Sequence, residues 1–147
     1  MPRETKFRIW DTTNHCFVYS DEKEGNCFLI KLNGEVTDGN GRHYDETYPI
    51  QQFAGIKDNV GADIYEGDIV KVYDSRNLFQ IKFGKVTRSV EAHTRKENYL
   101  LELNTFFFES LENKLPFFSI INNERGEHDL KGTRIVGNIF ENPELLK

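Results

Sequence analysis

Apolar and polar residues alternate over short stretches along most of the chain, which is the pattern of half-buried β-strands. In residues 79–83, Phe79, Ile81 and Phe83 would share one face of a strand, while the residues between them are polar. Comparable stretches lie at residues 6–10, 15–20, 98–103 and 134–140. Many short strands separated by turn residues predict a mainly β, largely antiparallel fold, either a barrel or a sandwich.

Turn signals divide the first third of the chain into hairpins. The Asn33-Gly34 dipeptide lies between two apolar stretches and tolerates positive φ at both central turn positions, which predicts a tight hairpin. Residues 38–47 are polar and rich in glycine, so we expect a loop and a seam there. We therefore expect an N-terminal hairpin layer over residues 1–47 and a small β-barrel domain over residues 48–147, able to pack as one unit.

The last third of the chain mixes helix and strand signals. Phe107, Leu111 and Leu115 have helical spacing after a capping residue, which predicts one or two short C-terminal helices. Residues 134–140 alternate as a strand that would close the barrel, and Pro143 would prevent that strand from continuing.

The composition is that of a folded chain with an uneven charge distribution. The 147 residues include 12 Phe, 6 Tyr and 1 Trp, enough large rings to build a core. The net charge is −5, yet residues 71–96 contain seven basic and only two acidic residues. This segment is either a surface for a polyanion or the solvated face of a hairpin.

Features of secreted and membrane proteins are missing from the sequence. The N-terminal residues have no apolar stretch of the signal-peptide type, and no run of 18 apolar residues occurs. Cys16 and Cys27 have no metal-site or disulfide-framework spacing, so we expect reduced thiols in the core. The expected location is the cytoplasm, with no membrane contact.

Three segments resemble a known protein family. They are "KFRIWD" at the start, "YPIQQFAGIKDNVGADIYEGDIVKV" at residues 48–72 and "IVGNIFENPELL" at residues 135–146. Together they resemble the YopX family, small proteins found mainly in bacteriophages and prophages. The resemblance implies an SH3-type small barrel and a phage origin, and it supplies no catalytic or ligand-binding residues.

Most residues that carry the resemblance are expected to be structural, because they have the chemistry of turns. These positions are Tyr48, Pro49, Gly55, Asp58, Gly61, Tyr65, Glu66, Gly67, Asp68, Gly137, Asn138, Asn142 and Pro143. The acidic residues in residues 58–68 raise the alternative of a Ca²⁺ or Mg²⁺ site, since these cations prefer oxygen ligands. Their spacing fits no EF-hand loop, and their side chains can bond backbone amides without an ion, so we predict turns and no metal.

The sequence contains no recognisable set of catalytic residues. The four histidines are scattered, and the chain has neither a nucleophile elbow nor a phosphate-binding loop. We therefore expect a non-enzymatic protein without cofactors.

Two surfaces remain as candidates for binding. Lys82, Lys85 and Arg88 could contact phosphates, as small barrels often bind nucleic acid, although the acidic pI of about 5.4 argues against it.

Phe106, Phe107 and Phe108 cannot all point the same way from a strand or helix, so at least one ring should face outward. Outward rings favour a homo-oligomer or protein partner. The preferred interpretation is a macromolecule-binding or self-assembling module, with nucleic acid binding as the alternative.

Overall fold

The computed structural model describes residues 4–21, 28–91, 98–117 and 132–147. Nearly all regular structure in these ranges is strand. The strands are β1 (Phe7–Asp11), β2 (Cys16–Tyr19), β3 (Phe28–Ile30), β4 (Val36–Asp38), β5 (His43–Tyr44), β6 (Ile50–Lys57), β7 (Asp63–Tyr65), β8 (Asp68–Val72), β9 (Leu78–Glu91), β10 (Asn98–Ser110), β11 (Pro116–Phe117) and β12 (Thr133–Asn138). A 3₁₀ turn, η2 (Pro143–Leu146), follows the last strand.

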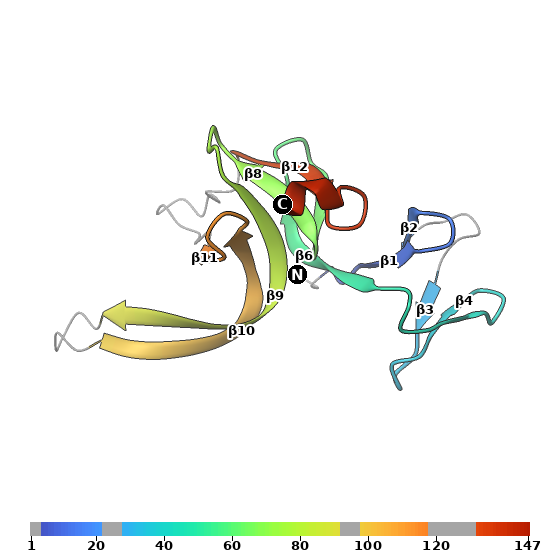
Figure 1. Ribbon diagram of the computed structural model, residues 1–147. Coiled ribbons are helices and arrows are strands. Elements are labelled where there is room, and N and C mark those ends of the chain that lie inside the picture. Colours follow the sequence, from blue (N-terminus) through green and yellow to red (C-terminus); the bar gives the residue numbers. More distant parts are fainter. Residues whose placement is uncertain (1–3, 22–27, 92–97, 118–131) are drawn as a thin grey trace.

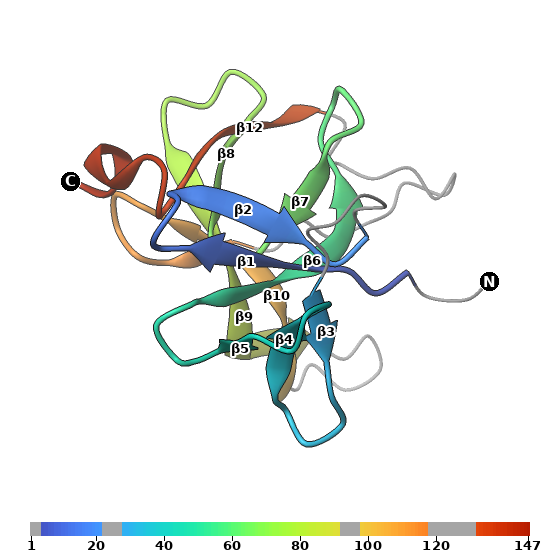
Figure 2. The same ribbon diagram turned by 90° about the vertical axis from the view of Figure 1, so that its right-hand side faces the viewer.

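The strands form three antiparallel sheets (Figures 1 and 2). Their orders are β2-β1-β6-β7, β11-β10-β9-β8-β12 and β3-β4-β5. The five-stranded sheet curls into a half-barrel, which confirms the mainly β prediction. The more specific SH3-type assignment stays a prediction.

The N-terminal hairpin belongs to the same sheet as the central segment. β1 pairs with β2 on one side and with β6 on the other. The expected boundary between residues 47 and 48 therefore runs through one sheet, because β1 before it pairs with β6 after it. Next to this sheet, Ile9, Val18, Phe28 and Val36 form one buried cluster.

A second cluster fills the half-barrel. Ile64, Val70, Ile81 and Phe108 are buried together, and Phe79 packs against them. Phe79 and Ile81 therefore point to the core as the alternating pattern predicts. Phe83 lies on the same face of β9, beyond the core, and its side chain is half exposed.

The turn at Asn33-Gly34 is built differently from the prediction. Gly34 has φ +86°, whereas Asn33 is not among the residues with positive φ. The Gly34 amide donates to the Lys31 carbonyl at 2.9 Å, and Asn33 Oδ1 accepts from the Glu35 amide at 3.1 Å. One left-handed glycine after an ordinary β-turn is enough to reverse the chain.

The predicted helix around Phe107 is wrong. β10 runs through this segment and pairs with β9 from Asn98 to Ser110 without interruption. Consecutive phenylalanines favour strand, and the long cross-strand ladder overrides a spacing of three apolar residues that only coincidentally matches a helix. The strand predicted near residues 134–140 is confirmed as β12, and Pro143 starts η2.

The outer parts of β9 and β10 leave the half-barrel as a two-stranded ribbon, which we call the arm (residues 84–91 and 98–105; Figure 1). Paired residues of antiparallel strands lie on the same face. Leu103 is paired with Val86, and Leu101 shares their face, whereas Lys85 and Glu102 lie on the opposite face. The arm is thus amphipathic.

Candidate functional site

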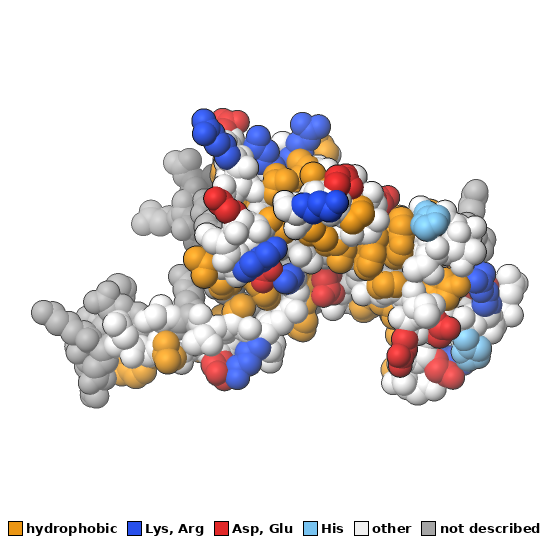
Figure 3. Space-filling view, in the orientation of Figure 1, with side chains coloured by type: hydrophobic (Ala, Val, Ile, Leu, Met, Phe, Trp, Pro, Cys, Tyr) orange, Lys and Arg blue, Asp and Glu red, His pale blue; other side chains and the backbone are white. Residues whose placement is uncertain are grey.

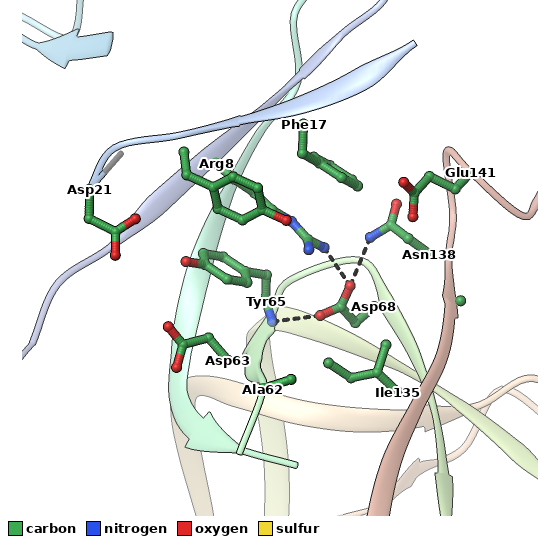
Figure 4. A pocket seen from close by; sticks show the side chains of 12 residues that line it. Arg8, Phe17, Asp21, Ala62, Asp63, Tyr65, Asp68, Ile135, Asn138 and Glu141 are labelled. Carbon is green, nitrogen blue, oxygen red and sulfur yellow. Dashed lines mark hydrogen bonds and ion pairs between the residues drawn. The ribbon is translucent and has the colours of Figure 1, made fainter. Parts of the chain in front are cut away.

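A buried polar network joins four strands, and Figure 4 shows the part of it in which Asp68 binds Arg8 and Asn138. Arg8 of β1 forms an ion pair with Asp68 of β8, and its Nε donates to Gln51 Oε1 at 2.8 Å. Asn138 Nδ2 donates to Asp68 Oδ1 at 3.0 Å and to Gln51 Oε1 at 3.3 Å. All four side chains belong to buried residues, so the network fixes how β1, β6, β8 and β12 meet.

Aromatic rings cover the Arg8 guanidinium. Its central carbon lies 4.0 Å from the ring centroid of Phe17 and 4.6 Å from that of Tyr65. Cation–π attraction therefore adds to the ion pair with Asp68. Burial in this environment raises the pKa of Tyr65 to about 12.

A half-open cavity of about 440 Å³ lies over this network. Its lining comprises Arg8, Phe17, Tyr19, Asp21, Ala62, Asp63, Tyr65, Asp68, Ile135, Gly137, Asn138 and Glu141. The lining is acidic and aromatic, and none of these twelve residues is a serine, cysteine or histidine. The ionisable side chains of the lining are four carboxylates, two tyrosines and the Arg8 guanidinium, so negatively charged groups outnumber the single cation.

Asp63, at the edge of the cavity, is held by two lysines. Lys6 Nζ lies 2.7 Å from Asp63 Oδ2, and Lys57 pairs with the other oxygen. Burial raises the pKa of Asp63, but the hydrogen bonds from Lys57 and Lys6 outweigh it, so the pKa lies below its ordinary value. The carboxylate is ionised and already paired.

The turn at residues 58–62 has the predicted chemistry. Asp58 Oδ1 accepts from the amides of Val60 at 3.0 Å and Ala62 at 2.9 Å. Asp58 Oδ2 accepts from the Ile135 amide at 3.4 Å, which ties the turn to β12. Gly61 has φ +89°. Asp58 is thus a turn residue, as predicted.

The acidic turn at residues 66–68 is a corner of the half-barrel. Gly67 has φ +81°, and its amide donates to the Ile81 carbonyl at 2.8 Å. Asp68 Oδ2 accepts from the Tyr65 amide at 2.8 Å, which confirms that this carboxylate caps a free amide. Burial raises the pKa of Glu66, while the backbone amides of Phe83 and Gln52 oppose this shift.

The remaining family positions also support the backbone. Tyr48 packs edge-to-face on Tyr44 and its hydroxyl accepts from Arg42 at 3.0 Å. The Pro49 carbonyl accepts from the Trp10 amide at 3.0 Å. Gly55 has φ +81° and lies where the β6–β7 register shifts.

At the C-terminal end, a Cβ on Gly137 would lie 2.7 Å from Asn142 Oδ1, so a larger residue there would force the Asn142 side chain to shift. Asn142 Oδ1 in turn accepts from the Asn138 amide at 3.2 Å, and Pro143 opens η2.

The predicted metal alternative finds no support in this geometry. The carboxylates of residues 58–68 point to separate partners, and no group of three or more His, Cys, Asp or Glu side chains in the described ranges could hold an ion. Cys16 is exposed at the start of β2, so it is not the core thiol we expected, and Cys27 lies outside the described residues.

The lysines of the basic segment do not share a face. Lys82 and Lys85 are three positions apart on an unbroken strand and therefore point to opposite sides. Lys82 pairs with Glu109 and Lys85 with Glu102, each at 2.7 Å. Of Arg88 only the backbone is described, paired with Leu101.

The three consecutive phenylalanines turn inward more than expected. Phe108 is in the core, Phe106 stacks edge-to-face on Phe83 with centroids 5.0 Å apart, and Phe107 is half-buried over Gly84. The exposed apolar residues lie in the N-terminal half of β10. Tyr99, Leu100, Leu101 and Leu103 are 53%, 76%, 46% and 38% exposed.

Sequence reasoning missed two features of this arrangement. Arg8 alternates with Phe7 and Ile9 and has the pattern of a solvent-facing residue, so nothing local marks it as buried. By contrast, three consecutive apolar residues at 99–101 cannot share one face of a strand, and this signal could have identified the exposed arm.

A family model described as "YopX protein" matches residues 6–147. The chain belongs to the YopX family. The matched region contains every residue of the buried polar network described above.

Among solved structures, this YopX protein is similar to the crystal structure of protein EF1440 from Enterococcus faecalis. The two are 27% identical, and the match covers 99% of this chain and 100% of that one with a TM-score of 0.52. No curated protein matches the chain. Within the described ranges, no helix has the length and hydrophobicity to cross a membrane.

Proposed function

We propose that this YopX protein is a non-enzymatic, phage-encoded module that acts in the cytoplasm by self-assembly through the arm. The single observation that carries the proposal is the exposure of Leu101 and Leu103, which lie on the same face of a two-stranded ribbon. Apolar side chains gathered on an exposed surface mark interaction sites. The phage origin is supported by the family resemblance alone.

The shape of the arm supports the same conclusion. An isolated two-stranded ribbon is at best marginally stable in water and gains stability from a third strand or a packed face. Hydrophobic side chains reach the surface along this ribbon in Figure 3. In this proposal the half-barrel is a small scaffold of the SH3 type that holds the arm in place.

The test is the mass of the protein in solution over a concentration series. We expect the unmodified protein to exceed the monomer mass, and Leu101→Asp to remain folded but monomeric. Leu32→Asp is the matched control, because Leu32 is a fully exposed leucine away from the arm and should leave the mass unchanged. A monomeric unmodified protein, or a Leu101→Asp variant with unchanged mass, would overturn the proposal.

Nucleic acid binding is the second candidate, favoured by the excess of basic residues at 71–96. The ion pairs of Lys82 and Lys85 count against it, since phosphate would have to displace Glu109 and Glu102. Anisotropy of labelled DNA and RNA across a salt series tests it. Binding whose logarithm falls linearly with log salt, and is lost in a Lys82→Glu/Lys85→Glu variant, would favour this candidate.

A further inference from the structure

Alternate residues of β10 direct their backbone amides and carbonyls to the outer edge of the sheet. The Leu111 amide donates inward to the Leu78 carbonyl of the β9 side, whereas the Ser110 amide donates outward to the Leu115 carbonyl. Because the direction alternates along a strand, Leu100, Glu102, Asn104 and Phe106 direct their amides and carbonyls to the outer edge. β11 covers this edge only at Phe108 and Glu109. No other described strand pairs with it between residues 100 and 106.

The two edges of the arm differ in charge. In the sequence of residues 84–91 of β9 the charged residues are Lys85, Arg88 and Glu91, and charged residues on an edge strand discourage strand pairing. Along residues 98–107 of β10 the only charged residue is Glu102. Its carboxylate is 2.7 Å from Lys85 Nζ, so it is neutralised within its own chain. The β10 edge therefore has fewer charged residues than the β9 edge.

The β10 sequence is complementary to itself in one antiparallel register. With Leu103 on a two-fold axis, Leu101 would lie opposite Thr105, Glu102 opposite Asn104, and Leu100 opposite Phe106. The outward-directed residues then meet each other, so their amides and carbonyls can bond. A shift of the axis to Glu102 would place the two copies of this glutamate opposite each other, which destabilises a sheet. A shift to Asn104 would bring Leu100 opposite Phe108, which already pairs with β11.

We propose that two copies of this chain join edge to edge through β10, antiparallel and centred on Leu103, so that the two arms form a continuous four-stranded ribbon. This inference rests on the proposed self-assembly and names its surface and register. The pairing is isologous, because the same residues contribute from both copies, and it therefore closes as a dimer. It brings the two Leu103 side chains together and satisfies the backbone groups of residues 100–106.

Cysteine cross-linking tests the register, in a full-length Cys16→Ser/Cys27→Ser background. Leu103→Cys should form a disulfide-linked dimer, since directly opposed residues have Cα atoms roughly 4.5–5.5 Å apart, within disulfide reach. Leu101→Cys and Thr105→Cys should each stay unlinked alone, because like positions would be roughly 13 Å apart. Mixing these two variants should give the linked heterodimer. Leu32→Cys, exposed and away from the arm, is the control for random cross-linking.

A second variant separates pairing from simple loss of fold. Asn104→Glu places a carboxylate next to Lys85 of its own chain, its partner in the β9–β10 ladder, so the monomer should be at least as stable. In the dimer the same change sets the introduced carboxylate at position 104 of one copy against Glu102 of the other, and this happens at two symmetric sites. We expect dimerisation to weaken by roughly tenfold.

The outcomes distinguish the inference from the proposed function. If the mass measurement shows Leu101-dependent assembly but Leu103→Cys does not cross-link above the Leu32→Cys control, the edge pairing is wrong and the arm assembles by its apolar face instead. Unchanged dimerisation in Asn104→Glu would overturn the register. A monomeric unmodified protein would overturn both the pairing and the proposed function.

Discussion

Arg8 and Asp68, sixty residues apart in the chain, form a buried ion pair that joins the N-terminal hairpin to the half-barrel. Arg8 packs against two aromatic rings, and Asp68 also binds the Tyr65 amide and the Asn138 side chain. Each charge has several partners, so the pair holds four strands in a single arrangement.

Asp68→Asn should lower the free energy of unfolding by roughly 3–5 kcal/mol, because it leaves the Arg8 charge buried without its counter-ion. Urea denaturation followed by circular dichroism measures this change. The combined Arg8→Met/Asp68→Leu variant should lose less than Asp68→Asn, since it removes both charges at once. A loss for Asp68→Asn below about 1 kcal/mol would show that the pair is solvated, as surface ion pairs are.

Gly67→Ala should destabilise the protein more than Gly34→Ala. Both glycines have positive φ, so both substitutions carry a backbone cost of roughly 1–2 kcal/mol. A Cβ on Gly67 would in addition overlap the Gln51 side-chain amide, whereas a Cβ on Gly34 meets nothing within 4 Å. Comparison of the two unfolding curves isolates the steric part, and equal losses would contradict the close packing at this corner.

Phe140→Ala should shift the fluorescence of Trp10 to longer wavelength. The two rings are stacked, with centroids 5.8 Å apart and planes 10° from parallel, and Trp10 is buried. Removal of the covering ring admits water to the only tryptophan of the chain. Phe83→Ala is the control, because Phe83 lies on β9 and should leave the emission unchanged. Identical spectra for the three proteins would show that Phe140 does not cover Trp10.

Asp63 should contribute stability at neutral pH that is lost in acid. Burial acts to raise its folded-state pKa, but the hydrogen bonds from Lys57 and Lys6 lower it by more, so folding favours the ionised form. The contribution is complete above the unfolded-state pKa of about 3.9 and disappears as the pH falls through the lower folded-state value. Asp63→Asn should therefore reduce stability at pH 7 but much less at about pH 2. An equal loss at both pH values would contradict this assignment.

Tyr65 should ionise later than an ordinary tyrosine. Burial raises its pKa to about 12, so the folded state retains its proton where the unfolded state, near pH 10, has begun to lose it. Its contribution to stability is present below pH about 10 and is lost as the pH rises toward 12. Ultraviolet titration of phenolate should show a late step that Tyr65→Phe removes. A late step of the same size in that variant would assign it to another tyrosine.

The sequence by itself determined the strands that have one face in the core and the other face in solvent. Phe79 and Ile81 alternate with polar residues and lie in the core, and the turn at Asp58 follows from side-chain bonds to nearby amides. These features depend on interactions between residues a few positions apart, so the local sequence pattern is enough to predict them. The family was also recognisable, because many of the positions that carry it lie in these same turns.

Only the tertiary structure decided which polar residues are buried and which apolar residues are exposed. Arg8 has the local pattern of a surface residue, yet Asp68, Gln51 and the ring of Phe17 surround it from other parts of the chain. Phe107 has helical spacing to Leu111, yet the β9–β10 ladder makes it strand. Leu101 and Leu103 continue a core pattern onto an arm that leaves the core. Burial depends on contacts between residues that are distant in the sequence, and the local pattern of apolar and polar residues cannot predict those contacts.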